Sequence, residues 1–205
     1  MEKTILIFLF TIVLLASLGD LLVPVFIGTK YPNYNHFIDT ISTLGTKDSP
    51  VQKYQRINLM IVGVLFLIFC IGEYLLFKQK TWAHNWYTVG IFMFGLGCIL
   101  AGIFPEDIQG TSETNSGKIH GISSGIGFLF LILVPLWAIW IKEFNTLKIM
   151  NIILFILGLI TFIIFLLSER QTNGVFKFTG FFQRLNLTVL YGALVANFIH
   201  LRNVL

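Results

Sequence analysis

The sequence predicts an all-α, polytopic membrane protein, with residues 1–205 forming a single transmembrane domain of about six helices. Hydrophobic residues make up 56% of the chain, charged residues only 12%, and the mean hydropathy is +0.82. A soluble domain carries about 25% charged residues, so this chain lacks the polar groups to cover a water-facing surface. Its apolar residues are also gathered in runs long enough to cross a hydrocarbon core of about 30 Å.

Each apolar run is expected to form one helix, because lipid supplies no hydrogen-bond partners and a spanning segment must satisfy its own backbone groups. The short alternating strands that a membrane barrel needs do not occur in the sequence. The six runs cover residues 5–27, 57–77, 85–104, 119–141, 149–168 and 185–201.

The first run has two interpretations. Lys3 and the apolar residues after it resemble a signal peptide, with Ser17-Leu18-Gly19 as the cleavage site. However, the apolar run resumes after Asp20 and continues to Ile27. We therefore expect this run to be retained as the first helix.

The loops between the runs alternate in length. Loops 78–84 and 142–148 are short, whereas loops 28–56, 105–118 and 169–184 are long and polar. With an even number of spans, all three long loops must lie on one side of the membrane. The long loops carry more Lys and Arg in total, but the short loops are denser in Lys and the first run begins after Lys3. The positive-inside rule therefore places the N-terminus in the cytoplasm and the long loops outside the cell membrane.

Charge and cysteine content exclude several other classes. The 14 Lys and Arg residues give a net charge of +4 but are scattered among loops, so we expect a lipid bilayer as partner and no nucleic acid. Cys70 and Cys98 both lie in apolar runs and cannot build a disulfide framework or a metal cluster. The sequence identifies no cofactor and defines no oligomeric state.

Small residues recur every four positions in two of the runs. Gly117, Gly121 and Gly125 lead into the fourth run, and the pairs Gly97/Ala101 and Cys98/Gly102 lie in the third. Such spacing lets helix backbones approach closely in lipid. Close packing is favoured over a groove for a ligand.

Asp20 is the most unusual polar residue for its position. It lies seven positions before Ile27, about 10 Å below the membrane face at a helical rise of 1.5 Å per residue. A carboxylate at that depth is costly unless it is paired, hydrated or protonated. Pro24 also removes the backbone N–H that would bond to the Asp20 carbonyl. Two interpretations stay open: an acid in a pathway or site, or a residue at a helix end that unwinds near Gly19.

The first long loop carries two candidate site residues. Ile38, Ile41 and Leu44 follow a three-residue spacing, which predicts a short amphipathic helix lying on the membrane surface. Asp39 and Ser42 share its opposite face. They are suited to orienting a substrate hydroxyl, although simple solvation is favoured on spacing alone.

The third connection has a polar residue near each end. Asp107 follows the third run, and His120 lies near the start of the fourth. An acid–imidazole pair would suit general-base catalysis, proton relay or metal binding. A polar contact that closes the loop is the favoured alternative. No metal site is predicted, because the chain lacks a local ligand spacing.

The fifth connection supplies Gln183 and Arg184 as candidate ligand-binding residues. Arg184 starts the last run, where it is placed to reach Asp20 or Asp107 or to hold a lipid phosphate. Reaching toward the headgroups as an ordinary interfacial cation is an equally weighted alternative. Glu73, at the other end of the bundle near Lys78, is expected to reach the membrane surface.

Three motifs resemble the prokaryotic family called domain of unknown function 998. The first is Tyr34…Asp39-Thr-Ile-Ser42-Thr-Leu-Gly45…Ser49-Pro50 followed by Asn58; the second is Gly102-Ile-Phe-Pro105-Glu-Asp107 followed by His120; the third is Gly180-Phe-Phe-Gln183-Arg184-Leu. The resemblance covers nearly the whole chain and implies a six-helix membrane protein with no established activity. It marks Asp39, Ser42, Asp107, His120 and Arg184 as motif positions, whereas Asp20 matches no motif.

Three functions are compatible with this pattern. The favoured one is binding of a lipid or small molecule at a polar site on the outer membrane face. The first alternative is an intramembrane lipid hydrolase or transferase in which Asp39, Asp107 and His120 act as acid, base or metal ligands. The second alternative is a small transporter, which only Asp20 with Pro24 encourages. No Walker loop, GxSxG, HExxH or CxxC motif occurs in the chain.

Overall fold

The computed structural model describes residues 2–108, 110–170 and 177–204, and the regular secondary structure within these ranges is all helical. Six helices are long and apolar enough to cross a membrane, which confirms the predicted all-α membrane architecture. The long helices are α1 (Glu2–Gly28), α2 (Gln52–Leu76), α3 (Trp82–Ile103), α4 (Asn115–Ala138), α5 (Lys148–Arg170) and α6 (Thr179–Val204); two short 3₁₀ helices are η1 (Ser42–Gly45) and η2 (Lys142–Leu147).

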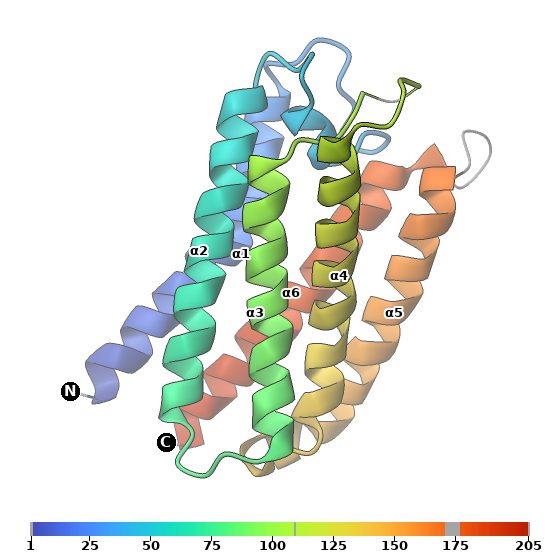
Figure 1. Cartoon of the computed structure of the whole chain (residues 1–205). Helices are drawn as coiled ribbons and strands as arrows, with labels where there is room; N and C mark the ends of the chain where they lie inside the picture. The colour runs from blue at the N-terminus through green and yellow to red at the C-terminus, as the bar shows by residue number, and fades with distance from the viewer. Residues whose placement is uncertain (1, 109, 171–176, 205) are drawn as a thin grey trace.

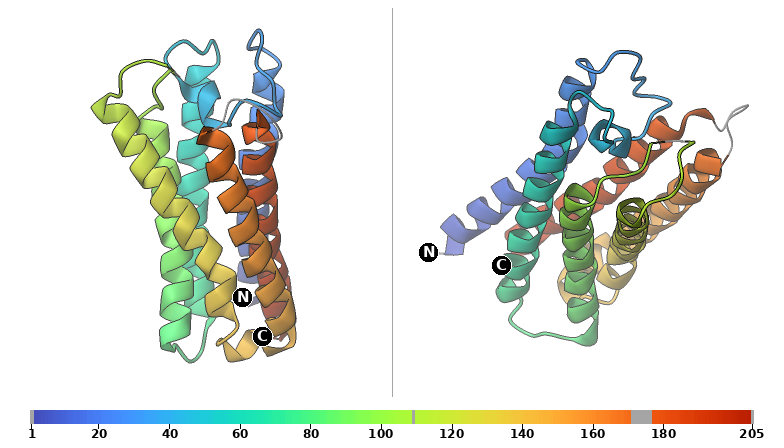
Figure 2. Two further views of the ribbon diagram at one scale, coloured as in Figure 1. Left: turned by 90° about the vertical axis from the view of Figure 1, so that its right-hand side faces the viewer. Right: turned by 45° about the horizontal axis from the view of Figure 1, so that its top comes forward.

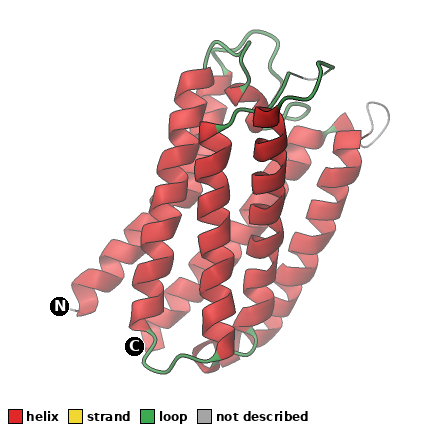
Figure 3. Ribbon diagram, in the orientation of Figure 1, coloured by secondary structure: helices red, strands yellow, loops and turns green. Residues whose placement is uncertain are grey.

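The helices form an up-and-down bundle with both termini at one end (Figure 1). We call the opposite end the long-loop end, because the segments that lead from α1 to α2 and from α3 to α4 gather there (Figures 2 and 3). Helix α3 packs between α2 and α4, while α6 contacts α1, α4 and α5. The sixth helix thus closes the bundle against the first.

Each predicted run lies largely within one helix, but the helix ends differ. Helix α2 begins at Gln52, before the predicted run at 57–77. The first turn of this helix is polar, so the apolar pattern did not include it. Helix α4 ends at Ala138, where the chain tightens toward η2. Helix α1 continues to Gly28 and contains Pro24, so the interpretation that it unwinds near Gly19 is wrong.

The glycine pattern packs differently from the prediction. A Cβ added at Gly97 of α3 would lie 2.8 Å from the carbonyl oxygen of Ser123 on α4, so Gly97 does allow a close helix approach. A Cβ added at Gly121 or Gly125 would have no neighbouring atom within 4 Å, so these two glycines do not serve close helix packing. The predicted packing stripe along α4 is therefore wrong. The close contact instead comes from the third helix.

The first loop folds inward rather than along the membrane surface. The predicted amphipathic helix is only the single 3₁₀ turn η1. Ile41 and Leu44 are 3% and 0% exposed, because η1 packs on α2. The prediction of a helix lying on the membrane is therefore wrong: Ile41 and Leu44 belong to the protein core, whereas Ile38 is 43% exposed.

The end of the bundle that holds both chain termini, which we call the terminal end, contains a buried polar cluster. Glu73 is 1% exposed and accepts a hydrogen bond from the Tyr87 hydroxyl at 3.4 Å. Asn151 and Asn197 exchange two amide hydrogen bonds of 2.9 and 3.0 Å between α5 and α6. Glu73 therefore does not reach the membrane surface, contrary to the prediction, because its carboxylate turns inward to Tyr87.

Candidate functional site

A pocket lies inside the bundle toward the long-loop end, beneath η1. Its empty space, which includes space open to the surroundings, amounts to about 420 Å³. The wall is mainly apolar or small and carries four polar side chains. The lining residues are Asp20, Ile41, Ser42, Leu59, Phe94, Gly97, Cys98, Ala101, Ser124, Gly127, Phe128, Gln183 and Leu187.

Ser42, at the start of η1, lines this pocket and contacts a histidine that lies outside the lining. The Ser42 Oγ lies 3.1 Å from Nε2 of His120, a buried residue in the second turn of α4. The other ring nitrogen, Nδ1, lies 3.0 Å from the backbone carbonyl oxygen of Phe104. The structure therefore joins two residues that the sequence analysis had singled out separately.

The Phe104 carbonyl fixes the role of each imidazole nitrogen. A carbonyl oxygen only accepts hydrogen bonds, so Nδ1 of His120 must carry the proton that it donates to Phe104. In the neutral ring, Nε2 is then an acceptor, and the Ser42 hydroxyl must donate to it. We call this arrangement the Ser42–His120 pair.

The last carbonyls of α3 are divided between an arginine and His120. Arg56 of α2 donates from Nε to the Gly102 oxygen at 2.9 Å and from Nη2 to the Ile103 oxygen at 2.7 Å. These contacts cap the last turn of α3, whose carbonyls have no partner within the helix. The next carbonyl in the chain, that of Phe104, points to the imidazole.

Gln183 fixes the position of η1 from the opposite side of the pocket. Its Oε1 accepts a hydrogen bond of 2.6 Å from the backbone N–H of Ile41, the residue before Ser42. The amide orientation follows from this contact, because a backbone N–H can only donate. Helix α6 thereby holds the backbone next to the Ser42 hydroxyl.

Asp20 lies at the deep side of the pocket. It is 3% exposed and sits eight residues before the end of α1, about 12 Å below that end. Its Oδ2 accepts a 2.6 Å hydrogen bond from the Tyr191 hydroxyl of α6. Its Oδ1 is buried and has no partner among the described residues. The pocket lining therefore includes a carboxyl group with one oxygen that has no hydrogen-bond partner among the described residues.

Arg184 does not contact Asp20 or Asp107 but clamps the first loop to α6. Its Nη1 donates to the carbonyl oxygens of His36, Asp39 and Gly180 at 2.8–3.1 Å, and its Nη2 donates to the Tyr34 hydroxyl at 2.6 Å. Burial raises the pKa of Tyr34, which keeps its hydroxyl protonated for a bond to the Thr40 carbonyl.

The N-terminus of α6 completes this docking. The backbone N–H groups of Gly180 and Phe181 donate to the carbonyls of Ile38 and Phe37 at 3.0 and 2.9 Å. The first N–H groups of a helix have no partner within the helix, so the loop satisfies them. The loop that carries Ser42 is thus held by backbone as well as side-chain contacts.

The two loop carboxylates each stabilise their own loop. Asp39 Oδ2 accepts from the backbone N–H of Asn35 at 2.7 Å. Asp107 accepts from the backbone N–H and the hydroxyl of Thr114, both at 2.7 Å, and these bonds lower the pKa of Asp107. Asp39, Asp107 and His120 therefore make separate contacts, and no group of three His, Cys, Asp or Glu side chains within the described ranges could hold a metal ion.

Three members of the site were missed by sequence reasoning. The Phe104 carbonyl has no residue-type signal, because every residue has a carbonyl. Tyr191 and Arg56 lie within or beside apolar runs and resemble ordinary core and interface residues. The only usable signal was that Ser42 and His120 fall in two motifs, and the structure shows that these motifs meet.

These features define a six-helix integral membrane protein with a largely apolar pocket that is polar at its long-loop edge and at its base. The chain belongs to the family described as "Protein of unknown function (DUF998)", which matches residues 14–200 and confirms the resemblance seen in the three motifs. No curated protein and no solved structure matches the chain.

Proposed function

We propose that this protein binds a single lipid-like molecule in the pocket, with a hydrocarbon chain against the apolar wall and a polar group near Ser42. The observation that carries this proposal is the pocket itself, which has the apolar wall and the few polar groups typical of ligand sites. By the positive-inside rule, we place this site on the outer side of the cell membrane.

The position of the pocket favours a ligand from the bilayer. Its wall is formed by helices whose outer surfaces face lipid, and Ser124 and Phe128 of α4 are partly exposed at its edge. A hydrocarbon chain that leaves the bilayer for an apolar cavity exchanges one apolar environment for another. Polar contacts at the ends of the pocket then select the ligand, because an unpaired polar group is costly in lipid.

The wall also offers complementary polar groups. Ser42 and Ser124 carry hydroxyls that donate or accept hydrogen bonds, and the Asp20 carboxylate has one oxygen without a partner among the described residues. A lipid with hydroxyl or ester groups supplies both donors and acceptors. Among the residues that the structure describes, no Lys or Arg lines the pocket, and Arg184 is engaged with the first loop.

Photo-cross-linking tests this proposal directly. The probe is phosphatidylglycerol with a diazirine in one acyl chain, incorporated into vesicles that contain the purified protein. We expect cross-links to Phe94 and Phe128, the two aromatic residues of the wall. Ser124→Phe, which fills the pocket edge, should lower this cross-linking about tenfold, the effect of losing about 1.4 kcal/mol of contact.

The matched control is Leu129→Phe on the same helix, because Leu129 is 50% exposed and does not line the pocket. This variant should cross-link at the wild-type level. Cross-links spread evenly over the lipid-facing residues, with no response to Ser124→Phe, would overturn the proposal.

A further inference from the structure

The Ser42–His120 pair has a geometry that a structural contact does not require. Its hydroxyl donates to the one imidazole nitrogen that carries no proton, and the other nitrogen is held by a backbone carbonyl. This is the relation between nucleophile, base and orienting group that activates a serine. The bridging distances, 3.1 and 3.0 Å, are within hydrogen-bond reach.

The pair also borders a space in which a substrate can sit. Ser42 is partly exposed and lines the pocket, whereas His120 is 5% exposed and lies behind it. An occupant of the pocket therefore meets the serine oxygen and not the imidazole. The same wall holds the Ser124 hydroxyl and the Gln183 amide, groups of the kind that stabilise a developing oxyanion.

We infer that Ser42 is the nucleophile and His120 the general base of an ester hydrolase whose substrate is an acyl ester with its hydrocarbon chain in the pocket. This inference rests on the proposed lipid binding and adds a reaction to it. Nothing else in the described chain brings a hydroxyl, an unprotonated imidazole nitrogen and a cavity together.

The reaction proceeds in two balanced halves. Ser42 Oγ attacks the ester carbonyl carbon while its proton passes to Nε2 of His120. The bond to the alcohol portion then breaks, and the alcohol leaves with that proton, so that the acyl group stays on Ser42. Water next attacks the acyl carbon and gives a proton to Nε2, which returns it to Ser42 Oγ as the carboxylic acid departs.

The orienting group sets an expectation for the speed of this reaction. In serine proteases, an aspartate holds the histidine in the correct tautomer and stabilises the imidazolium that forms. Here the Phe104 carbonyl fixes the tautomer of His120 but carries no full negative charge to stabilise an imidazolium. The carboxylate of Asp107 is close enough for the charge of His120 to contribute to the lowered pKa of Asp107, after the larger effects of Thr114. We therefore expect slow turnover, with Asp107 as a distant electrostatic aid.

An alkyl fluorophosphonate tests the nucleophile, because it phosphonylates only an activated serine. Purified protein in vesicles is treated with the probe, and the modified peptide is identified by mass spectrometry. We expect the label on Ser42, none on this peptide in Ser42→Ala, and labelling of His120→Asn slowed about 100-fold, the lower range for loss of a general base. Thr11→Ala, which removes a hydroxyl of α1 that bonds to the Ile7 carbonyl and lines no part of the pocket, should keep Ser42 reactive.

Parallel cross-linking with the diazirine lipid separates this inference from the proposed binding. His120→Asn should retain the lipid cross-links, because His120 does not line the pocket, and this retention also shows that the variant is folded. Absence of label from Ser42 in wild-type protein overturns the hydrolase, whether or not the lipid cross-links form. Label that persists at the wild-type rate in folded His120→Asn overturns the role of the base.

Discussion

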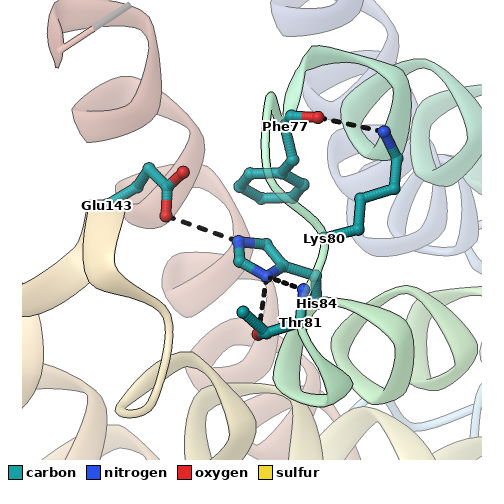
Figure 4. A network of polar contacts seen from close by, with 5 residues as sticks. All are labelled: Phe77, Lys80, Thr81, His84 and Glu143. Carbon is teal, nitrogen blue, oxygen red and sulfur yellow. Dashed lines mark hydrogen bonds and ion pairs between the residues drawn. The ribbon is translucent and has the colours of Figure 1, made fainter.

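Two buried histidines at opposite ends of the bundle differ in what their rings contact: His120 belongs to the proposed reactive pair, whereas His84 belongs to a helix cap. His84 begins α3 at the terminal end and lies between Thr81 and Glu143 (Figure 4). By residue type, this hydroxyl–imidazole–carboxylate set resembles a catalytic triad more closely than the Ser42–His120 pair does. Its Nε2 lies 3.4 Å from the Glu143 carboxylate, and its Nδ1 lies 2.8 Å from the Thr81 hydroxyl.

The difference lies in what the backbone does to each ring. At His84, the backbone N–H of Thr81 donates to Nδ1 at 3.0 Å, and the Thr81 hydroxyl accepts from the backbone N–H of His84. These are the two bonds of a capping box, so both groups already serve the helix start. At His120, a backbone carbonyl accepts a hydrogen bond from the Nδ1–H group, which leaves Nε2 as the acceptor. Thr81 and His84 also line no part of the pocket, whereas Ser42 does.

The largest expected effect comes from replacing a histidine by asparagine, once at each end of the bundle. His120→Asn should slow phosphonylation of Ser42 about 100-fold, because the base is lost. His84→Asn should leave the labelling rate within about twofold and should instead lower the melting temperature, since loss of a cap costs about 1 kcal/mol. Equal slowing by both variants would erase the distinction between the two histidines.

A smaller effect is expected from the clamp that holds the reactive loop. Arg184→Lys keeps the charge but cannot reproduce the planar set of bonds to Tyr34 and to the loop carbonyls. We expect a loss of about 2 kcal/mol in stability, typical for hydrogen bonds to a charged group. Ser42 labelling should fall with it, because η1 loses its anchor. Guanidinium added to the variant offers a rescue control, and full labelling of the untreated variant would contradict the clamp.

In the polar cluster at the terminal end, a substitution should change stability without changing the reactivity of Ser42. Asn197→Leu breaks the two amide bonds between α5 and α6 and should cost about 1 kcal/mol, the usual size for such bonds in membrane bundles. Thermal unfolding in detergent measures this loss. Ser42 labelling should stay at the wild-type rate, so a slowed rate would show that the two ends are coupled.

The smallest expected effect is a pH dependence at the long-loop end. Burial, and then the charge of Arg184, hold the pKa of His36 below its usual value of 6.5. The unfolded chain therefore binds a proton at higher pH than the folded chain, and stability falls as the pH drops through 6.5 toward the lower folded-state pKa. Thermal unfolding between pH 7.5 and about 5 should show this decline, and His36→Asn should flatten it. An unchanged slope in the variant would exclude His36 as its source.

The fold was largely predictable from the sequence, because length, apolar content and the backbone requirement in lipid leave few architectures. The exceptions are segments in which a short pattern competed with tertiary contacts. Ile38, Ile41 and Leu44 have helical spacing, but Ile41 bonds to Gln183 and enters the core instead. Glu73 has nearby lysines in sequence, yet Tyr87 supplies its buried partner.

The candidate site was predictable as residues but not as a geometry. Ser42 and His120 were both singled out, yet they are 78 positions apart. They meet because the loop between α1 and α2 brings η1 against the start of α4. Asp107 was the expected partner of His120, but it bonds to Thr114, and the carbonyl of Phe104 takes that place. The proposed roles of Asp39, Asp107 and Arg184 in chemistry stay predictions, since the contacts found for them support the loops.

The hydrogen bond between Gln183 and Ile41 has a consequence for biosynthesis. Ser42 is translated early, His120 more than halfway through, and the side chain that holds the serine segment belongs to the final helix. A nascent chain that has inserted only its first four helices contains both reactive groups but not the brace that positions them. For the proposed hydrolase, this order predicts that the serine segment is positioned only after the last helix has entered the membrane.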